Sequence, residues 1–172
     1  LRKLYRTIEA IASQTVDNDE DLFNRILHEI VQNEEIDIKG GRTWKFDPKT
    51  GSYELLYQVG ELEPIRRHYR VKLKDYPIFL ELPKRRTVLG NESDQYLRKA
   101  GILRYSATGI GDKITWRGKT LFRYVLALNA DHLDENLTST LNIISTALST
   151  ALRSKKIERK AQLLERDLDK AR

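Results

Sequence analysis

The sequence predicts an α+β protein built on an antiparallel sheet, and two observations support this class. Stretches with apolar residues at helical spacing lie near the two ends of the chain, at about residues 1–12, 19–32 and 134–172. Between them, alternating polar and apolar stretches are separated by turn sequences, and no strand–helix–strand unit repeats. We therefore expect the helices to lie on one face of an antiparallel sheet.

The first two predicted helices differ in the width of their apolar face. The first has a narrow stripe, which could pack against the terminal helix or against its own copy in a second chain: Leu1, Leu4, Tyr5, Ile8, Ile11 and Ala12. The second has a wider stripe and is expected to lie on the sheet: Leu22, Phe23, Ile26, Leu27, Ile30 and Val31. Asp17, Asn18 or Asp19 can cap this second helix, because a side-chain oxygen there can accept a backbone N–H.

The middle of the chain predicts strands and two short helices. Arg42–Phe46 and Tyr53–Val59 are expected to form a hairpin about the turn Asp47–Gly51. The other predicted elements follow in order: a strand at 69–73, a helix that begins at Pro77 and stops near Pro83, a strand at 87–90, a helix at 92–100, and strands at 102–107, 113–117 and 121–128. The segment 106–112 contains two glycines whose backbone could approach an anion, but a plain turn between strands is the simpler interpretation.

The terminal helix is the longest predicted element. Its 39 residues would extend roughly 58 Å, further than a domain of this size. Its first apolar series is expected to close the core: Leu137, Leu141, Ile144, Leu148 and Ala151. A second series, one position out of phase, is expected to face a parallel partner helix in a homodimer: Ile157, Ala161, Leu164, Leu168 and Ala171. The change of face is expected between Leu152 and Ile157, where 153–156 would form a polar collar.

Composition excludes several classes of function. The chain has no cysteine, so disulfides, thiolate metal sites and cysteine nucleophiles are excluded. No apolar run approaches 18 residues. His28, His68 and His132 are scattered, and no spacing places a metal site or a nucleophile–base pair. We therefore expect a chain without enzymatic activity, metal or cofactor.

The net charge of +6 is concentrated in two segments, 61–86 and 153–172, each with eight basic and four acidic residues. The second cluster is most simply the solvated faces of the terminal helix. No recognition motif or set of interleaved aromatics accompanies either cluster, so neither a nucleic acid nor a membrane is expected as a partner.

Two segments resemble parts of a known family. Arg42–Leu55, preceded by an amphipathic helix, resembles the opening hairpin of a GAF domain, and Trp116–Asn129 resembles its closing hairpin. The resemblance implies a central six-stranded antiparallel sheet with helices on both sides. It also implies a sensory or dimerisation role in cytoplasmic signalling. Bilin-binding members attach their chromophore through a cysteine, which this chain lacks.

A cyclic-nucleotide signature of the same family is present only in fragments. Asn129, Asp134 and Glu135 match its ends, whereas Ala130 stands where the family has lysine, and its phenylalanine is missing. The fragments are most simply coincidental.

The resemblance also predicts a division of the chain. Residues 1–152 correspond to the GAF-like sensor domain, and 153–172 to a signalling helix that leads, as a coiled-coil linker, to an output domain. Leu164–Arg172 is similar to the linker before serine/threonine phosphatase domains of the bacterial stage-II-sporulation type. A diguanylate cyclase or a histidine kinase are the alternatives. A start without Met and an end within a helix suggest a piece of a longer protein.

The middle segment, 61–111, matches the family poorly, and there the family builds its ligand pocket. If this chain has such a pocket, the candidate lining residues are Phe79, Tyr96, Arg98, Arg104, Thr108 and Trp116. Two functions stay open at this point. One is a sensor that binds a small ligand, and the other is a ligand-free dimerisation and transmission domain, which bulky side chains between sheet and middle helices would favour.

Overall fold

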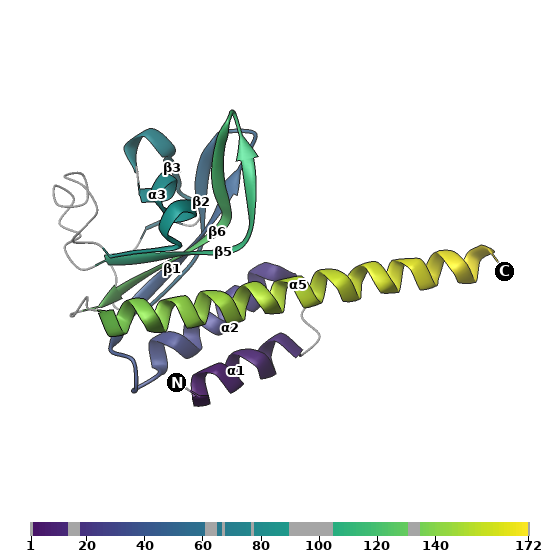
Figure 1. Ribbon diagram of the computed structural model, residues 1–172, viewed down its shortest axis with the longest axis horizontal. Coiled ribbons are helices and arrows are strands. Elements are labelled where there is room, and N and C mark those ends of the chain that lie inside the picture. Colours follow the sequence, from purple (N-terminus) through teal and green to yellow (C-terminus); the bar gives the residue numbers. More distant parts are fainter. Residues whose placement is uncertain are drawn as a thin grey trace.

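The computed structural model describes residues 2–13, 18–60, 65–66, 68–76, 78–89, 105–130 and 135–171. It shows the expected α+β class, with a six-stranded sheet in the order β3-β2-β1-β6-β5-β4 (Figure 1). All neighbouring strands are antiparallel. The strands are β1 (Ile38–Asp47), β2 (Ser52–Gly60), β3 (Arg70–Lys72), β4 (Thr87–Leu89), β5 (Tyr105–Trp116) and β6 (Lys119–Ala130).

Helices cover both faces of the sheet, as the resemblance implied. On one face, here called the α5 face, lie α1 (Arg2–Ser13), α2 (Asp19–Gln32) and the first part of α5 (Glu135–Ala171). On the other, here called the α3 face, lie the short η1 (Leu73–Asp75) and α3 (Ile78–Arg85). The expectation of helices on one face alone is therefore wrong, because the short central helix carries its own apolar side chains onto the second face.

The helices of the α5 face follow the sequence closely. Asn18 caps α2, since its side chain accepts a 2.8 Å hydrogen bond from the backbone N–H of Asp21. The apolar stripe of α2 is buried apart from the partly buried Val31, and His28 is exposed. Leu4 and Ile8 of α1 are buried in the same core, and α1 packs against α5 and α2. Of the two partners that were open for α1, the terminal helix of its own chain is therefore the one present.

The turn between β1 and β2 forms as its sequence predicted. The Asp47 carboxylate accepts a hydrogen bond from the backbone N–H of Lys49 at 3.0 Å, and Gly51 closes the turn with a positive φ of 65°. A Cβ at Gly51 would lie 2.5 Å from the ring of Trp116. Glycine is therefore required both by the backbone conformation and by the close approach of that ring.

The predicted turn at 106–112 is wrong, because β5 runs unbroken through it. The pairing of β5 with β6 is irregular between Ile110 and Lys113, where Gly111 has a φ of 80°. A Cβ at Gly109 would overlap the ring of Phe122. The two glycines thus serve a β-bulge and a close packing contact rather than a turn.

The predicted end of α3 near Pro83 agrees with the structure to within two residues, since the helix continues to Arg85. Proline removes one backbone donor, but the following turn still closes through a bond from the Arg86 N–H to the Leu82 carbonyl. The predicted helix at 92–100 lies outside the described residues. None of the described helices combines the length and apolarity needed to cross a membrane.

Candidate functional site

Half of the described α3 face is an aromatic cluster. It consists of Trp44, Phe46, Tyr53 and Phe79, each no more than 6% exposed. The ring of Phe79, from α3, stacks on Tyr53 of β2 with centroids 4.1 Å apart and an interplanar angle of 18°. The Tyr53 hydroxyl donates a 2.6 Å hydrogen bond to the Phe122 carbonyl, and burial raises the pKa of this phenol. Aromatic side chains therefore fill this half, with their one hydroxyl satisfied inside the protein.

The other half carries small residues beside a buried cation. The strand register places Gln58, Arg42, Ala127 and Ala107 in one row across β2, β1, β6 and β5. Arg42 is only 9% exposed. The two alanine side chains extend only a short distance from the sheet. The Arg42 guanidinium is the only charged group of this row. A buried guanidinium needs acceptors or an anion to offset its lost hydration. The Arg42 side chain has a partner within the protein, and its Nε is buried without a hydrogen-bond acceptor among the described atoms. This half of the α3 face therefore offers one unused donor beside small side chains.

Sequence reasoning missed Arg42, although a signal was present. Arg42, Trp44 and Phe46 alternate along β1, so all three lie on the same face of the sheet. Trp44 and Phe46 belong to the buried cluster of the α3 face. A charged residue in phase with two buried aromatics marks a polar position inside the core.

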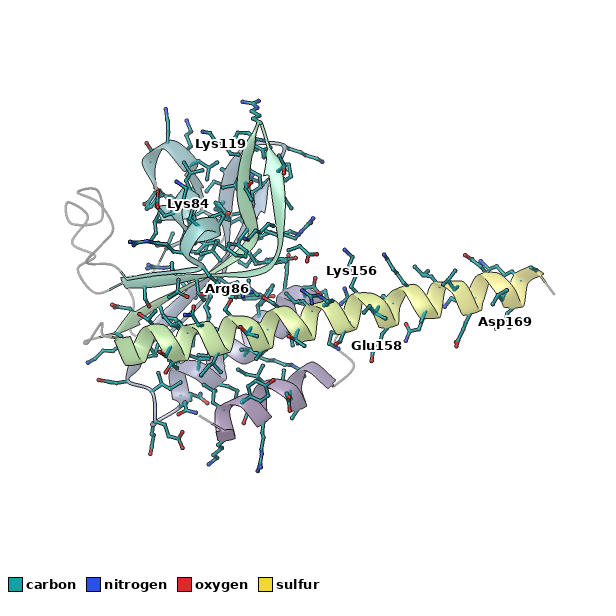
Figure 2. The ribbon with its side chains drawn as sticks, in the orientation of Figure 1. Lys84, Arg86, Lys119, Lys156, Glu158 and Asp169 are labelled. Atoms are coloured by element: carbon teal, nitrogen blue, oxygen red, sulfur yellow. The ribbon has the colours of Figure 1, made fainter. Side chains whose placement is uncertain are left out.

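A polar cluster on the opposite face joins α3 and β4 to α5. It consists of Arg86, Thr87, Thr108, Asn142 and Ser145. The hydroxyls of Thr87 and Thr108 lie 3.0 Å apart, and Thr87 donates a 2.5 Å bond to the Asn142 amide oxygen. Arg86 follows the last turn of α3 and donates from Nε to the Ser145 hydroxyl at 3.2 Å (Figure 2). The end of α3 is therefore bonded directly to α5.

The three predicted pocket residues that the structure describes do not come together. Phe79 lies in the aromatic cluster, and Trp116 lies at the hairpin tips, where its indole N–H donates to the Pro48 carbonyl at 3.0 Å. Thr108 points to the α5 face, away from the expected pocket, because it pairs with Leu126 of the α5-face core in the strand register. Thr108 and Trp116 are also about 26 Å apart along β5, at roughly 3.3 Å per residue. Tyr96, Arg98 and Arg104 lie outside the described residues.

The long helix α5 changes its role along its length. Leu141, Ile144 and Leu148 are buried against the sheet, as predicted. The side chain of Leu137 lies outside the described residues. In contrast, Ile157, Leu164 and Leu168 are 60–64% exposed, and Ala161 between them is exposed as well. In the described chain, nothing covers this stripe.

The change of face comes later than the sequence predicted. Lys155 was expected in a polar collar, but it is only 7% exposed and continues the buried series of Leu148 by one further heptad. A lysine can bury its aliphatic stem in such a position while its ammonium group reaches polar surroundings. The packed face of α5 therefore extends about one turn beyond Leu152.

A groove of about 500 Å³ lies where α5 leaves the domain. Its lining includes five basic side chains and two carboxylates: Arg123, Arg153, Lys156, Arg159, Lys160, Asp19 and Asp112. Arg159 pairs with Asp19 at 3.1 Å, and Lys156 with Asp112 at 3.7 Å. These pairs fasten the helix to the domain at its exit.

Catalytic or metal-binding chemistry has little support in the described part of the chain. No three His, Asp or Glu side chains are grouped there as metal ligands. His68 pairs with Glu54 at the β2–β3 edge, where the imidazole is 62% exposed. Arg70 also contacts Asp47 there, and this hydrogen bond, with one from the Lys49 N–H, lowers the pKa of Asp47. The edge is an ion-pair network that is open to solvent.

Comparison with known proteins gives matches in structure only. No family model matches the chain, and no curated protein sequence does. The phycocyanobilin-bound GAF domain of a cyanobacterial phytochrome superposes with a TM-score of 0.67 at 16% identity, covering 91% of this chain and 96% of that one. The GAF domain of the Acinetobacter phosphoenolpyruvate-protein phosphotransferase gives 0.61 at 15% identity, covering 90% and 92%.

An enzyme is among the similar structures. Free methionine-R-sulfoxide reductase from Neisseria meningitidis, in complex with its substrate, superposes with a TM-score of 0.66 at 13% identity, covering 91% of this chain and 90% of that one. At such identities the likeness concerns the fold and not the function. Strand order, the helices on both faces and these superpositions agree: the chain has the fold of a GAF domain.

Proposed function

We propose that the chain is the regulatory sensor module of a cytoplasmic signalling protein. In this proposal residues 1–152 sense a small ligand on the α3 face, and 153–172 form the dimeric helix that leads to an output domain. The observation that carries the proposal is α5 itself. One 37-residue helix is packed on the sheet in its first part and presents an exposed apolar stripe in its last part.

The polar cluster supplies a physical route between the two parts. Arg86 follows α3 directly, and its bond to Ser145 connects α3 with the packed part of α5. A ligand that shifts α3 would therefore displace a side chain bonded to the helix. Such coupling needs an element with two arrangements, and we propose that α5, which is packed in the core through Leu141, Ile144 and Leu148, rotates or shifts between them.

The ligand chemistry that fits the α3 face is a small anion. Arg42 is a buried cation in a row with Ala107 and Ala127. Two of the similar structures are named as bound to phycocyanobilin or to a substrate, so this fold can accommodate small molecules. The chain has no cysteine and therefore no thiol with which to attach or reduce a ligand. We propose a binding module without catalytic activity of its own.

A ligand-free dimerisation and transmission domain is the second candidate. The filled aromatic half of the α3 face favours it, because no small molecule could enter between Phe79 and Tyr53. A thermal-shift screen against cyclic nucleotides, amino acids, oxo-acids and haem separates the candidates. A ligand at 100 times its dissociation constant stabilises by about 2.7 kcal/mol. A flat response throughout would favour the second candidate.

The dimer is tested by placing charge on the exposed stripe. Replacing Leu164 and Leu168 with Lys is expected to give a folded monomer, because each apolar side chain contributes about 1.5–3 kcal/mol when buried. Ile144→Lys, on the packed part of the same helix, is expected to unfold the domain, since Ile144 is 1% exposed. Sedimentation velocity and circular dichroism distinguish the two results. A double-Lys variant that still dimerises would contradict pairing through this stripe.

The identity of the output is a separate proposal. The similarity of Leu164–Arg172 to a phosphatase linker favours a serine/threonine phosphatase of the stage-II-sporulation type, with a diguanylate cyclase or a histidine kinase as alternatives. All three would receive the signal through a paired helix. The gene that encodes this chain, read beyond Arg172, distinguishes them directly.

A further inference from the structure

We infer that charged side chains beside the exposed stripe of α5 direct it to pair in parallel, and in a single register, with a second copy of this chain. This inference rests on the parallel dimer proposed above and adds its register and the charges that fix its orientation. The stripe residues Ile157, Ala161, Leu164 and Leu168 are spaced by four, three and four residues. In heptad notation they occupy positions d, a, d and a, the seam of a two-stranded coiled coil.

The residues that flank this seam have complementary charges. Position g, just before a, is occupied by Lys160 and, one heptad earlier, by Arg153, which precedes the a residue Ser154. Position e, just after each d, is occupied by Glu158 and Glu165. In a parallel pair, each g side chain lies beside the e side chain five residues further along the partner helix. Arg153 would therefore meet Glu158 of the second copy, and Lys160 would meet Glu165.

The next heptad follows the same rule with the signs reversed. Its g position is Asp167, and the residue five positions further in the sequence is Arg172. An accidental run of basic g and acidic e residues would give no reason for both signs to change together. The reversal therefore favours a specific register over general attraction between a basic and an acidic edge.

The four flanking side chains are available for a partner. Arg153, Glu158, Lys160 and Glu165 are all exposed, and none of them forms an ion pair with another described residue. By contrast, Lys156 and Arg159, which lie away from the seam, bond to carboxylates of their own domain. Figure 2 shows Lys156 and Glu158 projecting from opposite sides of α5, with the helix beyond them clear of the domain.

In an antiparallel pair, these charges would interact less favourably than in a parallel one. Antiparallel helices bring g beside g and e beside e. Arg153 would then approach Lys160, and Glu158 would approach Glu165, so like charges would repel along both edges. The charge pattern thus selects the parallel orientation, which would deliver two output domains on the same side.

Two charge-reversed variants of this chain test the register. Arg153→Glu with Lys160→Glu makes both flanks acidic, and Glu158→Arg with Glu165→Arg makes both flanks basic. Each variant alone is expected to dimerise about tenfold or more weakly than the natural sequence. An equimolar mixture is expected to form heterodimers, and the chain with all four reversals should recover the original affinity. Arg166→Glu with Lys170→Glu is the matched control, with the same charge change as the acidic variant but away from the seam.

Sedimentation equilibrium and native mass spectrometry measure these outcomes, with circular dichroism to confirm folding. Reversed variants that dimerise like the natural sequence and show no preference for the heterodimer would overturn the register while leaving the dimer intact. A natural sequence that stays monomeric at high concentration would overturn the dimer itself, and the register with it.

Discussion

A buried arginine is costly at the scale of a single residue, because its hydration is lost and must be replaced by acceptors or by an anion. Arg42 lies at such a position, 9% exposed on a central strand of the sheet. Its direct neighbour on β6 is the small Ala127, and its Nε has no hydrogen-bond acceptor among the described atoms. Arg42 is therefore the residue on which recognition of an anionic ligand would depend.

Arg42→Met is expected to abolish the thermal shift produced by any anionic ligand of the screen, because the length of the side chain is kept and its charge is removed. The variant itself is expected to be less stable than the natural sequence, because it also loses the contacts that Arg42 makes within its own chain. Arg123→Met, at an exposed position of β6, is the control and should keep the shift. An anionic ligand that stabilises the Arg42 variant fully would contradict the assignment.

The candidate site was only partly predictable from the sequence, because the sequence does not give the register in which the strands pair. Phe79 was expected near a pocket and lies on the correct face, but its ring is used in a stack with Tyr53. Thr108 was placed on the wrong face because its segment was interpreted as a turn. In a turn, unlike in a strand, alternate residues are not assigned to opposite faces of the sheet. A strand register depends on pairing with distant residues, so a single sequence could not supply it.

At the scale of elements, the features fixed by local chemistry were predicted best. The turn Asp47–Gly51, the cap at Asn18 and the apolar stripe of α2 all depend on residues within a few positions of one another. The unbroken course of β5 depends instead on Phe122, whose ring occupies the space above Gly109. The residues around a glycine do not show whether it is required by a turn or by the approach of a distant aromatic ring.

Loss of a single hydroxyl where β4, β5 and α5 meet should lower the stability of the domain. Thr108→Val removes the contact with the Thr87 hydroxyl and a 3.3 Å bond to the Arg86 carbonyl, while its shape is kept. The Thr87 hydroxyl keeps its bond to Asn142, and the Arg86 carbonyl keeps its bond from the Gly109 N–H, so we expect the free energy of unfolding to fall by about 0.5–1.5 kcal/mol. Urea denaturation measures the difference.

Thr115→Val on the same strand is the matched control for that substitution. Thr115 is exposed, so its replacement should change the unfolding free energy by no more than about 0.5 kcal/mol. Equal effects of the two substitutions would mean that the polar cluster contributes nothing beyond strand propensity. In that case the bond from Arg86 to Ser145 would stand alone as the link between α3 and α5.

At the scale of the whole molecule, α5 sets the overall shape. Its 37 residues extend about 55 Å at 1.5 Å per residue, and Figure 1 shows its final part projecting far beyond the sheet. The pairs Arg159–Asp19 and Lys156–Asp112 are the last ion pairs between the described helix and its domain. Beyond them, residues 161–171 are all exposed, so little packing within the described chain holds them helical.

Isolated helices of this length are marginal in water, because nucleation is costly and each added residue contributes little. In the proposed dimer, the partner helix supplies the missing packing. We therefore expect backbone amides of residues 161–171 to be protected from hydrogen exchange in the natural sequence and to lose most of that protection in the Leu164→Lys, Leu168→Lys variant. Amides of 141–155 should stay protected in both, since Leu141, Ile144 and Leu148 are buried in their own domain. Exchange measured by mass spectrometry tests this, and strong protection of 161–171 in the monomeric variant would show that the helix is stable without a partner.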